Sequence, residues 1–405
     1  MWVSEIKSQA IPQGHARRTM SLSTLINTFG NGLFMTVEVI YFTLIIGLSP
    51  AKVALALSIA GGVALSFSVP AGHISDRFGP RDIASLAMVL EGALMFVLLS
   101  VHTYIPFLLV NIGMGILGNI SQTMRMATIA KLGEGEERVA IRAYQRAVTN
   151  FGISLGTVFA GIALAINTPI AYQLLLAGDA VTFILAGYVF RKMPYMQPTV
   201  ERGEPISFQA LRDKRFLGAT ALNAINSLHF VLQSVAIPLW VVRETTAPRW
   251  WVSVIMMVNT VAVMLFQVAA SKGSGPVFAG AKLYRRASLA ISIACILYST
   301  SHGVSAITAS AILILASAVH VYGELIGSAG SWSIGFGLAD EKHQGQYQGV
   351  WSLSWGLGGT LGPAFVTLMA ITLGQRGWFI MAVMFLINGI LMHKLVTRSW
   401  LSTPH

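Results

Sequence analysis

Charged residues and cysteine are both scarce in this chain of 405 residues. Asp, Glu, Lys and Arg make up 11% of it, against roughly 25% in ordinary soluble domains, and hydrophobic types make up 54%. A soluble domain of this size needs a charged surface, which leaves little room for a soluble enzyme. A disordered chain is excluded because it needs high charge and low hydrophobicity. The single cysteine, Cys295, excludes an internal disulfide framework and a cysteine-based metal cluster.

Other chemical signatures are missing as well. The sequence has no glycine-rich phosphate-binding loop, so we do not expect ATP to drive this protein. Its one His-xxx-Glu pair, His320 and Glu324, has no third ligand nearby to complete a metal site. We therefore predict no enzymatic activity, no cofactor and no metal.

Long apolar stretches are what the sequence has in abundance. A bilayer core about 30 Å thick needs about 20 apolar residues in a helix. Twelve stretches approach this length, which predicts an all-α integral membrane protein. They are 21–46, 53–71, 83–101, 104–130, 147–166, 172–190, 216–240, 250–270, 287–301, 306–337, 349–373 and 378–395.

The distribution of positive charge predicts the orientation. With the N-terminus inside, the cytoplasmic segments hold 22 of the 27 Lys and Arg residues, and the outside loops hold 4. Both termini are therefore expected in the cytoplasm, and the membrane is expected to be the inner or plasma membrane. The net charge of +11 could suggest nucleic-acid binding. Because it is spread over seven segments as a topological signal, we expect no nucleic-acid partner.

The chain shows a weak internal repeat. Ala143-Tyr144-Gln145 and Gln346-Tyr347-Gln348 open two apolar stretches about half the chain apart. The connection 191–215 is polar and carries three prolines, as a linker does. We therefore predict an N-terminal six-helix bundle (1–190), a cytoplasmic linker (191–215) and a C-terminal six-helix bundle (216–405), an arrangement common in secondary transporters.

One short loop carries a distinctive motif, GHISDRFGPR at residues 72–81. Gly72 leaves room for another helix, and the carboxylate of Asp76 suits the positive N-terminus of a neighbouring helix. Arg77 and Arg81 could pair with carboxylates of the next cytoplasmic loop, namely Glu134, Glu136 and Glu137. We interpret the loop as a gate whose contacts hold one end of the two halves together and break when that end opens.

This loop resembles the signature G-x-x-x-D-R-x-G-R-R of the major facilitator superfamily. The matching positions are Gly72, Asp76, Arg77, Gly79 and Arg81, whereas Pro80 replaces an arginine. The position of the loop after the second stretch, the twelve stretches and the central linker extend the resemblance over the whole chain. The resemblance implies a transporter working by alternating access, whose cavity is lined by the first and fourth spans of each half.

Two glycine-rich stretches indicate close helix packing. Gly152, Gly156 and Gly161 partly resemble the G-x-x-x-G-P-x-x-G-G motif of drug–proton antiporters, although Thr157 stands in place of its proline. The Gly-Pro version occurs in the second half, as Gly358, Gly362 and Pro363. Generic small-residue packing between helices is the alternative interpretation of both stretches.

Polar residues follow helical stripes in the first and fourth stretches of each half. The resemblance places these stripes on the cavity, and interhelical hydrogen bonding is the alternative for the amides. The aromatic ring of Trp355 is a further candidate for stacking on a hydrophobic substrate. The candidates for cavity or substrate contact are Asn27, Asn31, Gln122, Arg125, Asn223, Asn226, Phe230, Gln233, His320 and Trp355.

Four carboxyl groups lie at bilayer depth, where a charge costs about 2.5–3.5 kcal/mol on insertion scales. We predict that Glu38 and Glu324 couple transport to protons, because burial disfavours the charged form of a carboxyl group. A structural pairing, for Glu324 with His320, is the alternative. Glu91 and Asp179 are expected to make packing hydrogen bonds. Arg125 either reaches the cytoplasmic surface or pairs with a carboxylate at the inner end of the cavity.

These features predict proton-coupled export of a lipophilic small molecule, cationic compounds included, such as a drug or antibiotic. The excess of acidic over basic groups at membrane depth favours cations, and the partial antiporter motif favours export. One alternative is a proton-linked importer of a polar metabolite, and another is a receptor or scaffold with the same fold. The expected partners are the substrate, protons and lipid, and the expected state is a monomer.

Overall fold

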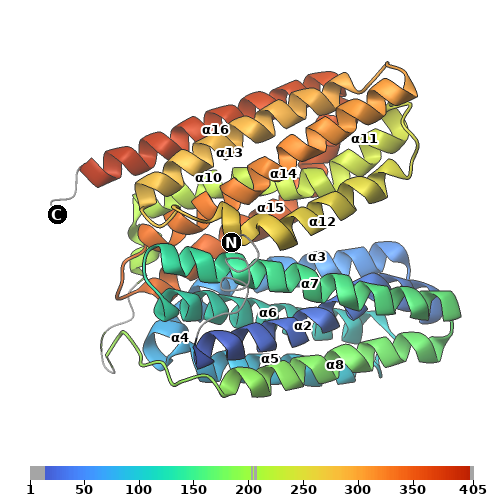
Figure 1. The fold of residues 1–405 in the computed structure, drawn as a ribbon. Helices are drawn as coiled ribbons and strands as arrows, with labels where there is room; N and C mark the ends of the chain where they lie inside the picture. The colour runs from blue at the N-terminus through green and yellow to red at the C-terminus, as the bar shows by residue number, and fades with distance from the viewer. Residues whose placement is uncertain (1–13, 202–203, 205–207, 402–405) are drawn as a thin grey trace, which may run out of the picture. The chain divides into compact units, whose positions relative to one another are not determined.

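The computed structural model describes residues 14–201, 204 and 208–401. An apolar bilayer offers no hydrogen-bond partner, so a spanning segment must satisfy its backbone internally, and a helix does so. The described part contains no β-strand, only an isolated antiparallel bridge between Thr245 and His302. In chain order the elements (Figure 1) are α2 (His15–Ile40), η1 (Tyr41–Ile45), α3 (Pro50–Ser66), α4 (Ser68–Phe78), α5 (Pro80–Leu98), α6 (Tyr104–Leu132), α7 (Glu136–Ile166), α8 (Pro169–Arg191), α9 (Gln209–Arg212), α10 (Lys214–Val231), η2 (Leu232–Ala236), α11 (Ile237–Glu244), α12 (Trp251–Ala270), α13 (Val277–Thr300), α14 (Ala306–Gly337), α15 (Gln344–Thr367), η3 (Leu368–Thr372) and α16 (Gln375–Leu401), where η marks a π-helical segment.

Most of these helices are long and apolar enough to cross a membrane. Within the described ranges nine spans meet this condition, and the pair α3 and α4, bent by 43°, would be a tenth. Helices α5 and α13 occupy the predicted spans 83–101 and 287–301 but carry more charge, for example Glu91 in α5 and Arg285 in α13. The all-α membrane fold expected from the sequence is therefore confirmed, with these two helices as its least apolar members.

The chain divides into two compact units, and each half of the sequence lends a short segment to the other unit. The first unit comprises the described residues of Met1–Glu134, Tyr144–Gln209 and Asp340–Gly349. The second comprises those of Gly135–Ala143, Ala210–Ala339 and Val350–His405. The start of α7 thus belongs to the second unit and the start of α15 to the first. The division at residues 190 and 216 remains a prediction from the sequence.

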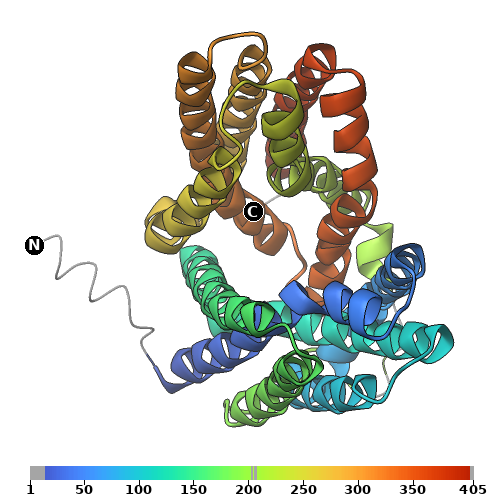
Figure 2. The ribbon, with the colours of Figure 1, turned by 90° about the vertical axis from the view of Figure 1, so that its right-hand side faces the viewer.

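The same helix pairs pack in both units. In the first unit, α8 packs on α2 and α5, and α6 packs on α5 and α3. In the second unit, α16 packs on α10 and α13, and α14 packs on α13 and α12, in the same order along the chain. Figure 1 shows α13 lying between α14 and α16, and Figure 2 shows the helices of each unit gathered into a bundle. The weak repeat in the sequence has this repeated packing as its structural counterpart.

Glycines set the closest helix contacts. Gly152 and Gly156 of α7 lie against α2, where an added Cβ at Gly156 would collide with the carbonyl oxygen of Phe29. Gly32 of α2 faces Gly156 directly. Gly161, which the sequence groups with them, does not take part, since an added Cβ there would meet no atom within 4 Å.

The equivalent contact in the second unit involves α15 and α10. An added Cβ at Gly358 would collide with Ser227, and one at Gly362 would lie 2.8 Å from Val231 Cγ2. Pro363 lies inside α15, where it supplies no backbone N–H to the helix. The structure places the two glycine-rich stretches at corresponding helix contacts, so they serve close packing in both units.

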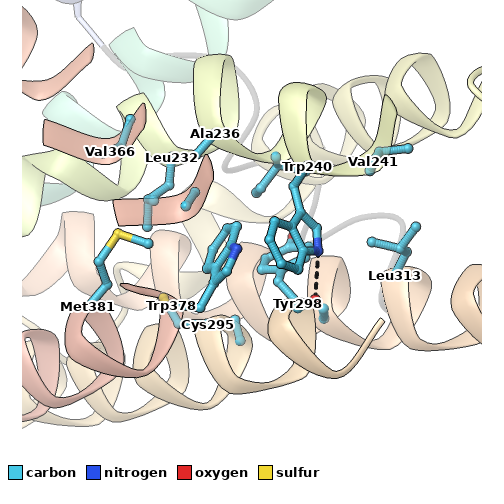
Figure 3. Packing of buried hydrophobic residues seen from close by; sticks show 14 of the residues in the cluster. Leu232, Ala236, Trp240, Val241, Cys295, Tyr298, Leu313, Val366, Trp378 and Met381 are labelled. Carbon is cyan, nitrogen blue, oxygen red and sulfur yellow. Dashed lines mark hydrogen bonds between the residues drawn. The ribbon is translucent and has the colours of Figure 1, made fainter. Parts of the chain in front are cut away.

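Buried aromatic rings form the centre of the second unit (Figure 3). Trp240 and Trp378 meet edge to face at 5.6 Å between ring centroids. The indole N–H of Trp240 donates to the carbonyl oxygen of Tyr298 at 2.9 Å and contacts Ser301 Oγ at 3.1 Å. Cys295 lies in the same cluster and is buried, as expected for a packing residue. These contacts join α11, α13 and α16, and the one polar atom of Trp240 is satisfied.

Replacing Gly156 with alanine should destabilise the protein, because the added methyl group meets backbone atoms that cannot rotate away. We expect a loss of about 1–3 kcal/mol, as for overpacked cores. Thermal loss of helical circular dichroism in detergent measures it. The matched control is Gly161→Ala on the same helix, which should unfold like the wild type. Equal unfolding temperatures for the two variants would contradict the contact.

Candidate functional site

The carboxylate of Asp76, near the end of α4, caps the start of α15. It accepts hydrogen bonds from the backbone N–H of Gly345 at 2.7 Å and of Gln346 at 2.9 Å. The first turn of a helix has free N–H groups and a partial positive charge, which together attract an anion. Asp76 is fully buried. The structure therefore places the predicted gate aspartate on a helix N-terminus, the partner that its charge favours.

Glycines make this approach possible. An added Cβ at Gly72 would collide with the carbonyl group of Gly345, and one at Gly79 would lie 2.5 Å from the carbonyl oxygen of Met196. Gly79 also ends α4 with φ +81°, a conformation that other residues rarely adopt. Both motif glycines are thus needed for contacts with segments distant in sequence.

The first part of the linker lies along the same loop. The backbone N–H groups of Thr199 and Val200 both donate to the carbonyl oxygen of Asp76, at 2.9 and 3.2 Å. Lys131 donates to the carbonyl oxygen of Gln197 at 2.6 Å. Asp76 therefore binds the linker through its backbone and α15 through its side chain.

Arg81 of the motif has partners on its own helix and in the linker. Arg81 pairs with Asp82 at 2.9 Å and donates to the carbonyl oxygen of Met193 at 3.1 Å. Glu136 accepts from the backbone N–H of Gly273 at 2.6 Å, and the pairing of the motif arginines with Glu134, Glu136 or Glu137 stays a prediction. An arginine follows the nearest acceptor in the folded chain, which here comes from its own helix and from the linker.

A surface ion pair joins two further segments of the first unit. Lys342 Nζ lies 2.8 Å from Glu204 Oε1. The hydrogen bond from Lys342 lowers the pKa of Glu204, and the same bond raises the pKa of Lys342. Exposed pairs of this kind are weak, so we regard this contact as secondary to the buried carboxylate of Asp76.

The polar stripe of α2 and α6 is only partly buried. Arg125 Nη2 donates to Asn27 Oδ1 and contacts Met88 Sδ at 3.9 Å. It also interacts electrostatically with Glu91, which fits the pairing proposed from the sequence rather than escape to the surface. Asn31 is half-buried, whereas Gln122 is exposed within the first unit.

Glu38 lies near the other end of α2. It is buried, and its Oε1 has no hydrogen-bond partner among the described residues. Its electrostatic neighbour is Asp179 of α8, which in turn interacts with Glu91 of α5. Sequence reasoning assigned Glu91 and Asp179 to helix packing and missed the interaction of Asp179 with both Glu38 and Glu91. The sequence signal for this interaction is that Glu38, Glu91 and Asp179 all occur in the first half of the chain.

The amide stripe of α10 serves mainly helix packing. Asn223 donates to Ser354 Oγ at 2.7 Å and accepts from Ser331 Oγ at 2.8 Å, which joins α10, α14 and α15. Asn226 is buried with an unpartnered Oδ1 in the described structure, and Gln233 is half-buried.

Aromatic rings continue the α10 stripe. Phe230 lies 4.7 Å from Trp355 between ring centroids and 3.8 Å from the ring of His229. Both Phe230 and Trp355 are partly exposed within the second unit. These rings form an apolar surface that could stack on a flat hydrophobic molecule.

Glu324 and His320, one helical turn apart on α14, have separate partners. Asn259 Nδ2 of α12 donates to Glu324 Oε2 at 2.6 Å, a contact that sequence reasoning missed. His320 Nε2 lies 3.4 Å from His229 Nδ1 instead. No group of three or more His, Cys, Asp or Glu within the described residues could hold a metal ion.

Comparisons with known proteins point to one family. A family model described as Major Facilitator Superfamily matches residues 20–363. The human organic anion transporter MFSD10 (TETRAN) is similar in structure, with TM-score 0.72 and 14% identity over 93% of this chain and 98% of that one. A bacterial homologue of the iron transporter ferroportin in its outward-facing state has TM-score 0.74 and 13% identity, over 96% and 100%.

The transporter FucP, in its outward conformation, has TM-score 0.71 and 11% identity over 94% of this chain and 98% of that one. At these identities the likeness shows the fold alone. A search of curated protein sequences finds no match.

Replacing Asp76 with asparagine should loosen the start of α15, because the neutral amide binds the two N–H groups more weakly than the carboxylate. We expect deuterium exchange at the Gly345 and Gln346 amides to rise about tenfold, the equivalent of 1.4 kcal/mol. Mass spectrometry of peptides from this region measures it. Glu341→Gln, an exposed residue before α15, is the control. Unchanged exchange in Asp76→Asn would show that the carboxylate does not hold the helix start.

Proposed function

Since the chain belongs to the major facilitator superfamily, it is a multi-pass membrane transporter of a small molecule and not an enzyme, and we propose that it exports a lipophilic substrate in exchange for protons. Lipophilic cations are the substrate class that we favour. The related structures are named for different cargo, organic anions and iron among them. The substrate class is therefore argued from the side chains of this chain.

The imbalance of charge inside the helices carries this proposal. Glu38, Glu91, Asp179 and Glu324 are buried carboxyl groups, and Arg125 is the single guanidinium at comparable depth in the described helices. Such an excess of acidic groups attracts protons and cationic substrates and repels anions. The partly exposed rings of Phe230 and Trp355 supply an apolar surface for a lipophilic molecule.

The contact between Asp76 and α15 is the part we assign to gating. Helix α15 begins in the first unit and continues from Val350 in the second. A transporter that alternates between two facing states needs a contact that is made in one state and broken in the other. We assign that role to the Asp76 cap, since its two hydrogen bonds can be replaced by water when they break.

The coupling step is assigned to Glu38 and Glu324, which take up a proton from one side and release it to the other. Glu38 has an unpartnered Oε1, so a proton there costs no existing hydrogen bond. Glu324 accepts from Asn259, an amide that can serve either protonation state by rotating. One carboxyl group in each unit would let both bundles respond to the proton gradient.

Transport assays test this function. An efflux-deficient bacterium that expresses the chain is profiled for growth against a compound panel, and the compounds it resists are used in liposomes holding purified protein. We expect substrate movement against its gradient when a pH gradient is imposed, and proton movement when substrate is added. A resistance profile confined to anions, or export that ignores the pH gradient, would contradict the proposal.

Glu38→Gln mimics the protonated carboxyl group permanently. We expect it to abolish uphill export under a pH gradient, at least tenfold below the wild type, while downhill substrate exchange persists. Glu324→Gln in the same assay decides whether coupling resides in one unit or in both. Glu341→Gln, exposed and outside the helices, is the charge-matched control. Wild-type uphill export by Glu38→Gln would remove Glu38 from the coupling step.

We also propose that both termini lie in the cytoplasm. Single cysteines at Ser49 and Thr246, both exposed, should react with an impermeant thiol reagent added to intact cells. A cysteine at Thr199, in the linker, should react only after the cells are opened. Cys295 is buried and does not compete. Labelling of residue 199 in intact cells would reverse the orientation.

A further inference from the structure

Four charged side chains lie inside the first unit, each on a different helix. Glu38 comes from α2, Asp179 from α8, Glu91 from α5 and Arg125 from α6. Electrostatic interactions link them in sequence, because Asp179 interacts with Glu38 and Glu91 interacts with both Asp179 and Arg125. Packing of α8 on α2 and α5, and of α5 on α6, brings them together. We call these four side chains the acidic cluster.

Two glycines leave the room that the carboxyl groups occupy. An added Cβ at Gly30 of α2 would collide with Asp179 Oδ1, and one at Gly118 of α6 would lie 3.0 Å from Glu91 Oε1. The carboxyl groups are therefore inserted against the backbones of neighbouring helices and do not extend toward lipid. This placement removes them from water, where an ionised carboxylate is most stable.

The polar atoms of the acidic cluster lack the donors that anions require. Glu38 Oε1, Glu91 Oε2 and Asp179 Oδ2 have no hydrogen-bond partner in the described structure. Among the described residues, the unpartnered donors beside them are Asn27 Nδ2 and Arg125 Nε, two nitrogen donors for three carboxyl groups. A buried carboxylate is usually held by several donors. Sites with so few donors favour carboxyl groups that carry protons.

Within the described part of the chain, the side chain of Asp179 has one polar contact, with the hydroxyl group of Thr182. Thr182 Oγ1 lies 2.7 Å from the backbone carbonyl oxygen of Asp179 and 3.2 Å from Asp179 Oδ1. The hydroxyl group has one hydrogen, which it shares between the backbone carbonyl oxygen and the carboxyl group, with the shorter contact to the backbone. The Asp179 carboxyl group therefore receives only part of one hydrogen bond, and its Oδ2 receives none from the described residues.

Charge balance gives the number of protons. Three ionised carboxylates and one guanidinium would leave two uncompensated negative charges in the interior. An uncompensated charge inside the membrane is unfavourable. The cluster is neutral when two protons are bound and the third carboxylate faces Arg125. Glu91 is that third group, because it is the carboxyl group that interacts with Arg125.

We propose that the acidic cluster is a proton-binding site of the first unit, in which Glu38, Asp179 and Glu91 share two protons against the single charge of Arg125. The site deepens the proton coupling proposed above and extends it to Glu91 and Asp179. When the two protons lie on Glu38 and Asp179, the ionised Glu91 faces Arg125. When one of them moves to Glu91, Arg125 is left to Asn27, its hydrogen-bond partner in the structure. Protonation would thus control a hydrogen bond between α6 and α2.

The experiment needs no substrate and no pH gradient, so it is decided separately from the transport assay. Purified protein is titrated while infrared spectroscopy follows the carbonyl stretch of protonated carboxyl groups. We expect such bands at neutral pH, and we expect each of Glu38→Gln, Asp179→Asn and Glu91→Gln to remove intensity. In each variant the titration midpoint of the remaining groups should move by about one pH unit, as coupled sites do.

Proton counting gives the second measurement. From neutral to alkaline pH the wild type should release two more protons than the triple variant, and Arg125→Gln should raise this difference to three. Gly118→Ala should shift the titration because it displaces Glu91, whereas Gly113→Ala on the same helix, which meets only the end of Leu94, should not. If the wild type shows no infrared band of a protonated carboxyl group, or if the band does not change with pH, the proposal is overturned even when no variant folds. If the titration midpoint of each carboxyl group is unchanged by substitution of the others, the three groups are separate and do not form one site.

Discussion

The carboxylate of Asp76 against the first turn of α15 is the contact on which the arrangement of the first unit most depends. Its oxygens hold the start of a helix encoded some 270 residues later, and its backbone carbonyl oxygen holds the linker. A buried anion needs donors, and a helix N-terminus provides them without a second charge. Gly72 and Gly79 follow from this requirement, because any side chain at either position would separate the segments.

The exchange of short segments between the sequence halves has a symmetric form. The start of α15 belongs to the first unit through Asp76, and the start of α7 belongs to the second through Glu136, which accepts from the loop before α13. In both cases a carboxylate binds backbone N–H groups. Glu136 lies in the short segment that belongs to the other unit, whereas Asp76 lies in the unit that contains the start of α15. Asp76 binds two N–H groups at a helix start and Glu136 binds one in a loop, so the two contacts are similar in kind but not equivalent.

The buried charges are distributed unequally between the two units. The first holds three carboxyl groups and Arg125 at depth, whereas the second holds Glu324 with an amide partner and a pair of histidines. Aromatic packing around Trp240, Trp378 and Tyr298 fills the second unit instead. Two bundles with the same helix packing thus have different interiors.

The sequence by itself determined the class of protein, the helical stretches, the loop of residues 72–81 and its family, because hydropathy and a local motif need no knowledge of contacts. It also indicated that Asp76 would meet a helix end. Only the tertiary structure decided which helix that was, and that Arg81 pairs with Asp82 and Glu136 with Gly273. Likewise, Glu38, Glu91 and Asp179 stand far apart in sequence and become neighbours through the packing of α2, α5 and α8. Local patterns define helices and their charges, but partners across helices depend on packing between residues far apart in the chain.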